Sequence, residues 1–300
     1  MATTSTSIPQ ALPSPARPLL GVSERRKILR LFLRNRMAML GLAVVLAWVF
    51  IALLAPLIVP YDPIDQDIPR RLQAPSAAHW LGVDDLGRDV FSRLLYGGRV
   101  SIPVAAVVVV IASLFGTVYG GVSGFAGKWV DEIAMRLVDM VLAFPSLILA
   151  MAIAAALGPS IQNSMLALLL VWWPPYARLA RGQVLALKTR DYVTAARALG
   201  MSEQRILLRH VLPNSFAPTL VLMTMDFGTA IIITAALSFL GLGAVPPTPE
   251  WGAMVAEGRE LVQQWWISAF PGLAILTLSI GCNFIGDGLR DAIDPRMRLR

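Results

Sequence analysis

The sequence predicts an all-α integral membrane protein with six transmembrane helices. Hydrophobic residues make up 56% of the chain and charged residues only 15%, so membrane lipid is needed to cover the apolar surplus. The long apolar runs alternate with polar connections. Lys and Arg gather in every second connection, which gives those runs a defined orientation in a membrane.

Two N-terminal segments precede the main apolar runs. Residues 1–23 are rich in Ser, Thr and Pro, and we expect a disordered tail there rather than a cleavable signal peptide. Ser23–Arg36 is basic with apolar residues at helical spacing, which predicts an amphipathic helix along the inner membrane face. Met37–Val59 carries no charge and predicts the first span. Residues 24–60 are therefore expected to hold this helix and the first span.

The rest of the chain divides into an outer connection and a core. Residues 61–99 carry six aspartates and are expected outside the cytoplasm. Residues 100–300 are expected to form a five-span core with a cytoplasmic loop at 178–215. The five predicted spans are Val100–Val122, Ile133–Leu157, Ile161–Ala177, Phe216–Leu242 and Ser268–Ile285. In the second of these, Arg136 and Asp139 lie one helical turn apart and are expected to pair.

The basic residues set the predicted topology. The segments that would face the cytoplasm hold 20 of the 26 Lys and Arg residues. These segments are 1–36, 124–136, 178–210 and 286–300. This bias follows the positive-inside rule and places both termini in the cytoplasm. Because orientation explains the net charge of +7, no nucleic-acid partner is required.

The sequence offers no catalytic or metal-binding constellation. Cys282 is the single cysteine, which excludes an internal disulfide and a cysteine-based metal cluster. His79 and His210 stand alone in the sequence, so we expect no metal centre. Gly120–Lys128 is glycine-rich but lacks the phosphate-loop pattern. We therefore expect no bound cofactor and no enzymatic activity in this chain.

A polar, basic stretch at Asp191–Asn214 separates two long apolar runs. Tyr192–Leu199 contains three alanines and predicts a helix that Gly200 ends in a left-handed conformation. Ser202 is placed to cap a second short helix. Pro213 is expected to end that helix, because its ring removes a backbone donor.

This stretch also predicts a docking surface. Ala195 and Ala196 form a small-residue patch that another protein could approach closely. A basic rim surrounds the patch, made of Arg190, Arg197, Arg205 and Arg209. An ordinary basic loop lying on the membrane surface is the structural alternative.

The stretch resembles the "EAA" loop of bacterial ABC importer permeases. That pattern reads Glu-Ala-Ala, three residues, Gly, nine residues, a hydrophobic residue, any residue, then Leu-Pro. Two positions depart from it, because Thr194 stands in place of the Glu and His210 in place of the hydrophobic residue. In the family this loop is the coupling helix that docks in a groove of the ATPase subunit. The resemblance implies a coupling site at Thr194, Ala195, Ala196, Gly200, Leu212 and Pro213.

Three further segments are similar to dipeptide, oligopeptide and nickel importer permeases of the C type. They are His79–Ser101, Leu237–Met254 and Gly286–Arg296. The resemblance implies a subunit of the bacterial inner membrane that pairs with a second related permease. It also implies two ATPase subunits carrying ATP and Mg²⁺, and an extracytoplasmic substrate-binding protein. A di- or oligopeptide is the expected substrate, with nickel or a glutathione-like peptide as alternatives.

Asp226 is the acidic residue expected near the bilayer centre. If the span begins at Phe216, Asp226 lies ~15 Å along the helix. A carboxylate at that depth costs about 3 kcal/mol, so it should face the bundle interior, a partner or water. We interpret Asp226 as a pathway residue for a peptide ammonium group or a metal cation, with Thr229 and also Thr224 and Thr234 on the same face.

Other interpretations of Asp226 and of the whole chain stay open at this stage. The carboxylate would instead pair across a permease interface, or the helix would start one turn away from the assumed position. An ion-coupled secondary transporter that uses Asp226 is the main rival function. The third candidate function is a membrane-embedded assembly subunit without a transport pathway.

Overall fold

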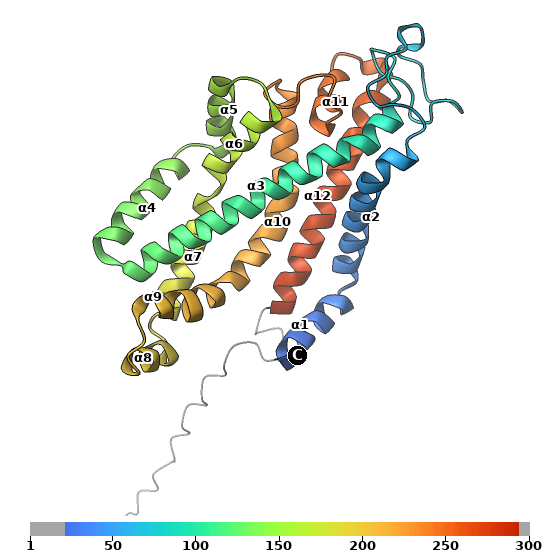
Figure 1. Cartoon of the computed structure of the whole chain (residues 1–300). Coiled ribbons are helices and arrows are strands. Elements are labelled where there is room, and N and C mark those ends of the chain that lie inside the picture. The colour runs from blue at the N-terminus through green and yellow to red at the C-terminus, as the bar shows by residue number, and fades with distance from the viewer. Residues whose placement is uncertain (1–21, 294–300) are drawn as a thin grey trace, which may run out of the picture.

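The computed structural model describes residues 22–293, whose regular secondary structure is entirely helical. Four long helices lie side by side as the main bundle (Figure 1). They are α2 (Arg36–Ile58), α3 (Val90–Ala126), α10 (Leu212–Phe239) and α12 (Trp266–Ile293). The expected tail, residues 1–23, lies outside the described residues except for its last two positions, which belong to a helix.

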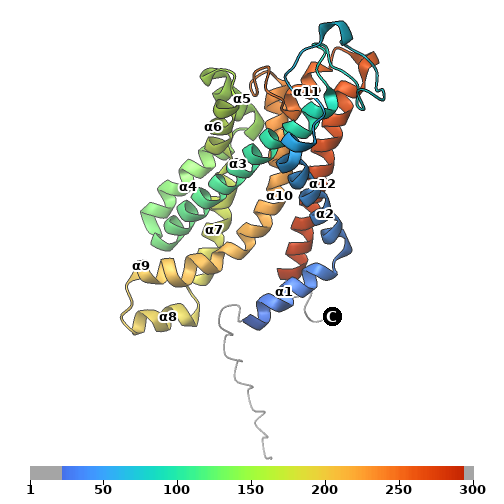
Figure 2. The same ribbon diagram turned by 45° about the vertical axis from the view of Figure 1, so that its right-hand side comes forward.

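Shorter helices extend the bundle at its side and ends. Helices α4 (Lys128–Leu142), α5 (Ser146–Leu157), α6 (Ile161–Trp172) and α7 (Pro174–Leu187) form a second group beside it (Figures 1 and 2). One end carries α1 (Val22–Arg34), α8 (Asp191–Ala198), α9 (Glu203–Ile206) and the π-helical turn η2 (Leu207–Val211). The opposite end carries residues 61–89 with η1 (Ile68–Arg70), α11 (Trp251–Glu257) and η3 (Val262–Gln264).

The helices match an all-α membrane protein but give fewer clear spans than expected. Four helical stretches within the described residues are long and apolar enough to cross a membrane: α2, α3, the continuous stretch Glu203–Phe239, and α12. Helices α4 and α5 form a pair bent by 84°, which would count as a fifth. The run expected to be the fourth span, Ile161–Ala177, is broken at Trp173 between α6 and α7, and each of these helices is short.

The expectation that Pro213 ends a helix is wrong. The helical path continues from Glu203 to Phe239, and Pro213 lies in the first turn of α10. A proline is tolerated there because the π-helical turn just before it changes the hydrogen-bond spacing and the missing donor is not needed. The Asn214 side chain donates to the His210 carbonyl and so satisfies an acceptor at this joint.

A glycine stripe on α3 lets α7 approach at backbone distance. Gly116, Gly120 and Gly124 follow one another at four-residue spacing along α3. A Cβ at Gly116 would collide with the Trp173 carbonyl, and one at Gly120 with the Ala177 carbonyl. Close contact of this kind fixes helices in a membrane through van der Waals packing. Helix α7 is therefore tied to α3 along its length.

Two of the family-like segments meet at the end that carries α11. Trp251 is fully buried, and its indole Nε1 donates to the Leu94 carbonyl at 2.9 Å. The same ring lies over Gly97, where a Cβ would come within 2.8 Å of it. Ser101 donates to Glu250 at 2.9 Å. The segments around residues 79–101 and 237–254 thus form one packed unit.

Replacement of Gly120 by Val should destabilise the purified protein. The new side chain would force α3 and α7 apart, and overpacking of this kind costs about 1–3 kcal/mol or more. Gly182→Ala in α7 is the matched control, because its new Cβ has no atom within 4 Å and alanine favours helix. Thermal unfolding in detergent measures both variants. Equal unfolding temperatures for Gly120→Val and the native protein would contradict the close helix contact.

Candidate functional site

The basic stretch forms a short helix, a glycine turn and a second short helix. Helix α8 ends at Ala198, and Gly200 follows with a φ of +77°, which is costly for any residue with a Cβ. The next helix begins after Ser202, as expected, but the Ser202 side chain makes no capping hydrogen bond. The predicted helix–glycine–helix order of this loop is therefore present.

One face of α8 packs against the protein's own core. Val193 and Ala196 lie in an apolar cluster with Val184 of α7 and with Ile206 and Val211 of the following helical turns. Ala196 is only 7% exposed. The structure thus corrects the expectation that Ala196 belongs to an open docking patch, and gives it the role of attaching α8 to α7 and to the start of α10.

The opposite face of α8 is open. Thr194 and Ala195 are exposed, and no atom lies within 4 Å of a Cβ built on Gly200. Leu199 is 84% exposed, and Leu208 of the following π-helical turn is 67% exposed. Both leucines are therefore free to contact a partner protein or the membrane surface. Leu199 leaves the apolar stripe of the helix because α8 ends one residue before it.

An ion pair braces the outer side of this turn. Arg197 donates to Glu203 at 2.6 Å and links α8 to α9 across the glycine turn. The hydrogen bond to the Glu203 carboxylate raises the pKa of Arg197 above its ordinary value. Both side chains are well exposed, so this pair contributes little to stability and serves mainly to orient the two helices.

Leu212 and Pro213 lie at the joint between the loop and α10. Leu212 is half-buried against the apolar cluster of the loop and against Gly121 of α3. Pro213 is exposed in the first turn of α10. These two residues connect the loop to the bundle and do not share the open face of α8.

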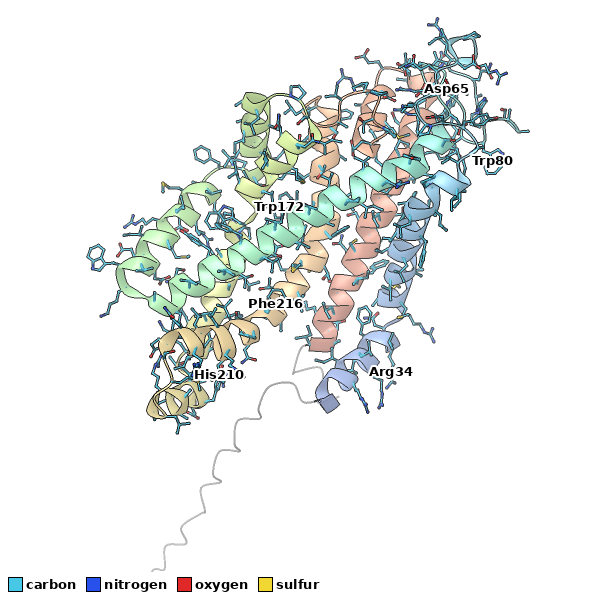
Figure 3. All side chains as sticks on the ribbon, viewed as in Figure 1. Arg34, Asp65, Trp80, Trp172, His210 and Phe216 are labelled. Atoms are coloured by element: carbon cyan, nitrogen blue, oxygen red, sulfur yellow. The ribbon has the colours of Figure 1, made fainter. Side chains whose placement is uncertain are left out.

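Asp226 lies near the middle of α10 and faces the second helix group. The Trp172 indole donates to its carboxylate at 3.4 Å, and the Tyr176 ring of α7 interacts with it electrostatically. Trp172 points into the molecule from α6 (Figure 3). The Tyr176 hydroxyl is buried and has no hydrogen-bond partner of good geometry within the described residues. Because α10 starts at Leu212, one turn before the expected start, the sequence-based depth of Asp226 shifts by about 6 Å.

Of the three threonines expected on the face of Asp226, Thr224 and Thr234 lie elsewhere on α10. Thr229 is exposed and lies less than one turn from Asp226. Thr224 lies against Gly286 of α12, on another side of the helix. Thr234 is buried. Only Thr229 stays a neighbour of Asp226 on a common face.

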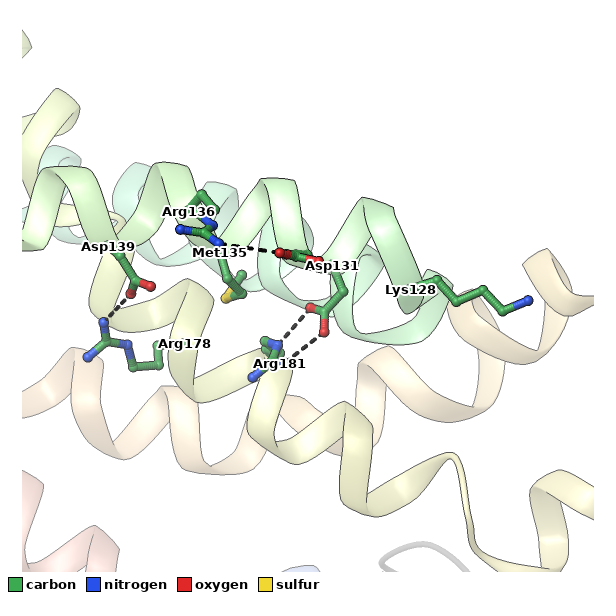
Figure 4. Close-up of a pocket in the computed structure, with 8 residues that line it drawn as sticks. Lys128, Asp131, Met135, Arg136, Asp139, Arg178 and Arg181 are labelled. Atoms are coloured by element: carbon green, nitrogen blue, oxygen red, sulfur yellow. Dashed lines mark hydrogen bonds and ion pairs between the residues drawn. The ribbon is translucent and has the colours of Figure 1, made fainter.

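A charged cleft of about 510 Å³ separates α4 from α7 at the end that carries α8 (Figure 4). Arg181 of α7 donates two hydrogen bonds to Asp131 of α4, both at 2.7 Å. Arg178 pairs with Asp139 at 2.7 Å. The expected pair of Arg136 with Asp139 is wrong, because Arg136 turns to Glu132 on its own helix while Asp139 faces α7.

The opposite end of the molecule contains a buried charge network. Arg88 contacts Asp84 at 2.6 Å and Glu257 at 3.1 Å, and Arg93 contacts Glu257 at 2.9 Å. Burial raises the pKa of Glu257, and the two guanidinium groups oppose that shift. Carboxylate oxygens of Asp84, Asp85 and Glu257 lie within 4.8 Å of one another, a spacing that suits a cation. In this structure Arg88 and Arg93 already supply positive charge beside these carboxylates.

His79 and Ser92 both bind Asp89 at the start of α3. The His79 ring nitrogen Nδ1 lies 2.9 Å from Asp89, and the Ser92 hydroxyl donates to the same carboxylate at 2.7 Å. The histidine and the serine contact the aspartate rather than each other, which is not the order of a hydrolytic triad. All three are buried, and Asp89 also caps α3 through the Ser92 amide. The cluster is structural.

Two family models match the chain. Residues 112–299 match the family described as binding-protein-dependent transport system inner membrane component. Residues 23–75 match the N-terminal transmembrane domain of oligopeptide transport permease C. The matched regions include the loop, the cleft and Asp226.

Curated relatives are similar over nearly the whole chain. The dipeptide transport system permease protein DppC of Alkalihalophilus pseudofirmus is 44% identical over 95% of this chain and 94% of its own. The probable D,D-dipeptide transport system permease protein DdpC of Escherichia coli is 47% identical over 84% and 85%. The glutathione transport system permease protein GsiD of Pectobacterium atrosepticum is 42% identical over 91% of each chain.

A solved structure shares the fold. The MetNI methionine ABC transporter in an inward-facing conformation has a chain that matches 67% of this chain and 97% of its own, with a TM-score of 0.56 and 16% identity. The expected ABC permease fold is therefore confirmed. Given the family match over residues 112–299, this chain belongs to the inner-membrane components of binding-protein-dependent transport systems and is an ABC importer permease rather than an enzyme.

Proposed function

We propose that this permease carries di- or oligopeptides, paired with a second related permease that completes the pathway. The names of relatives at 44% and 47% identity support a peptide substrate. A glutathione-like peptide is the alternative that one relative supports. Nickel as a substrate is supported only by the sequence resemblance. An ion-coupled secondary transporter is disfavoured, because the chain belongs to a family of multi-subunit importers.

We propose that the open face of α8 docks on an ATPase subunit. The observation that carries this proposal is the strong exposure of Leu199 beside Ala195 and Thr194, on a helix whose other face is fixed to the core. Each of two ATPase subunits would hold ATP and Mg²⁺, and this chain would bind no cofactor itself. Closure of the ATPases would displace α8 and, with it, α7 and the start of α10.

We further propose six spans with both termini in the cytoplasm. In this arrangement α4 with α5 and α6 with α7 each cross the membrane as broken helices. Residues 24–60 then hold most of helix α1 and the first span. Residues 61–99 form the outer segment, and residues 100–300 form the core. The acidic outer surface includes a cleft of about 540 Å³ lined by Asp85, Glu257 and Glu260. This end is the proposed dock for the substrate-binding protein.

The topology predicts opposite labelling of two exposed positions. In a cysteine-free background made by Cys282→Ala, Glu260→Cys should react with a membrane-impermeant maleimide added to intact cells. Lys128→Cys should react only after the cells are opened. Both side chains lie in loops or helix ends that line open clefts, so neither should be shielded by protein. Labelling of Lys128→Cys in intact cells would overturn the orientation.

Docking predicts a specific crosslink. Ala195→Cys in the same background should crosslink to a cysteine in the groove of the co-expressed ATPase, with a yield that changes when ATP is added. Ala196→Cys is the matched control, since this neighbouring side chain is buried in the protein's own core and should crosslink poorly. Equal yields from both positions, or none from Ala195→Cys, would contradict the proposed orientation of α8.

Asp226 is proposed to line the pathway together with Thr229. Asp226→Asn should lower peptide uptake by the assembled importer about tenfold or more, because a hydrogen bond to a charged group is worth about 1.5–3 kcal/mol. Asp226→Glu keeps the charge and should retain most of the uptake. Uptake is measured with labelled peptide in proteoliposomes. Full uptake by Asp226→Asn would remove Asp226 from the pathway.

A further inference from the structure

Helix α7 is positioned to transmit motion of the α8 loop. Only three residues, Lys188 to Arg190, separate α7 from α8. Val184 of α7 shares an apolar cluster with Val193 of α8, so the two helices pack together as well as follow each other. At the same end, the Lys188 ammonium group donates to the Gly124 carbonyl at the end of α3. A displacement of α8 must therefore move α7.

Helix α4 is jointed at both of its ends. Gly127 precedes α4 and Lys128 begins it, with φ values of +66° and +51°, which break the path from α3. Beyond Leu142 the chain turns by 84° into α5. Between these joints, the apolar contact of α4 with the bundle centres on Val138, which is buried beside Tyr176 and Ala177 of α7. The remaining link between α4 and α7 is ionic.

The ionic link is strongest at Asp131 and Arg181. Both guanidinium bonds measure 2.7 Å, a bidentate arrangement that fixes distance and angle together (Figure 4). The side chains are partly shielded, with Asp131 only 12% exposed. Arg178 and Asp139 form a second bridge between the same helices, at 2.7 Å but largely exposed. Shielding and bidentate geometry make the first pair the stiffer connection.

The cleft does not have the charge pattern of a ligand site. Arg136, Arg178 and Arg181 each have a carboxylate partner, whereas Lys128, the fourth basic side chain of the cleft, has none within the described residues. Lys128 points away from the ion pairs (Figure 4). An anionic ligand would have to break existing pairs to enter, so a role in holding the helices together fits the geometry better.

We propose that Asp131 and Arg181 form a clasp that makes α4 follow α7 when the ATPase moves α8. They act as positioning residues for transport, because they carry the displacement of the coupling loop into the broken helix pair α4–α5. This inference rests on the proposed docking of α8. Loss of the clasp should therefore separate ATP hydrolysis from transport while leaving the complex assembled.

The test uses the assembled importer in proteoliposomes and measures peptide transported per ATP hydrolysed. Asp131→Asn should lower this ratio at least about threefold, in line with the coupling changes that single substitutions produce. The double variant Asp131→Arg with Arg181→Asp should recover part of the loss, because it restores opposite charges across the cleft. Glu132→Gln is the matched control: it removes a carboxylate of the same cleft whose partner lies on its own helix.

The Ala195→Cys crosslink, introduced into the same variants, separates the two proposals. If the crosslink persists in Asp131→Asn and the transport ratio does not fall, the clasp is overturned while docking stands. A parallel loss of ATP hydrolysis and transport, without rescue by the charge exchange, would assign Asp131 a role in folding only and also overturn the clasp. If Ala195→Cys fails to crosslink in the otherwise native chain, docking and the clasp fall together.

Discussion

The backbone contact between α3 and α7 is the constraint on which the functional end of this permease depends. Gly116 and Gly120 leave no room for a side chain between the two helices. A contact of this kind has little freedom to slide, because packed interfaces shift between discrete arrangements rather than deform continuously. The α8 loop is therefore attached to two helices that are fixed to each other. Any displacement of the loop would have to be shared by α3 and α7.

A second constraint holds the opposite end together through buried charge. Arg88 and Arg93 are almost fully buried and share Glu257 of α11. Removing one partner of such a network leaves an uncompensated charge and costs about 3–5 kcal/mol. The network joins the segment near residue 88 to the one near residue 250, although they lie far apart in the chain. Neither segment can satisfy its charges or bury Trp251 without the other.

The sequence predicts those features of the loop that depend only on a residue and its near neighbours in the chain. The positive φ of Gly200 follows from the residue itself, and a helix starts after Ser202 although the Ser202 side chain does not cap it. The expectations for Pro213 and Ala196 are wrong because the roles of these residues depend on tertiary contacts. A widened turn accommodates the proline, and an apolar cluster covers the alanine. Likewise the partner of Asp139 lies on α7, a helix no sequence pattern had placed beside it.

The proposed coupling loop and the proposed pathway meet on α7. Tyr176, which faces Asp226, and Arg181, which holds Asp131, are five residues apart on this helix, about 7.5 Å along its axis. A rigid displacement of α7 would therefore change the surroundings of the Asp226 carboxylate and the position of α4 in the same step. No separate chain of contacts is needed between the ATPase side and the middle of the membrane. Helix α7 packs against the glycines of α3 on one side and forms ion pairs with α4 on the other. Its displacement alone would therefore change both regions.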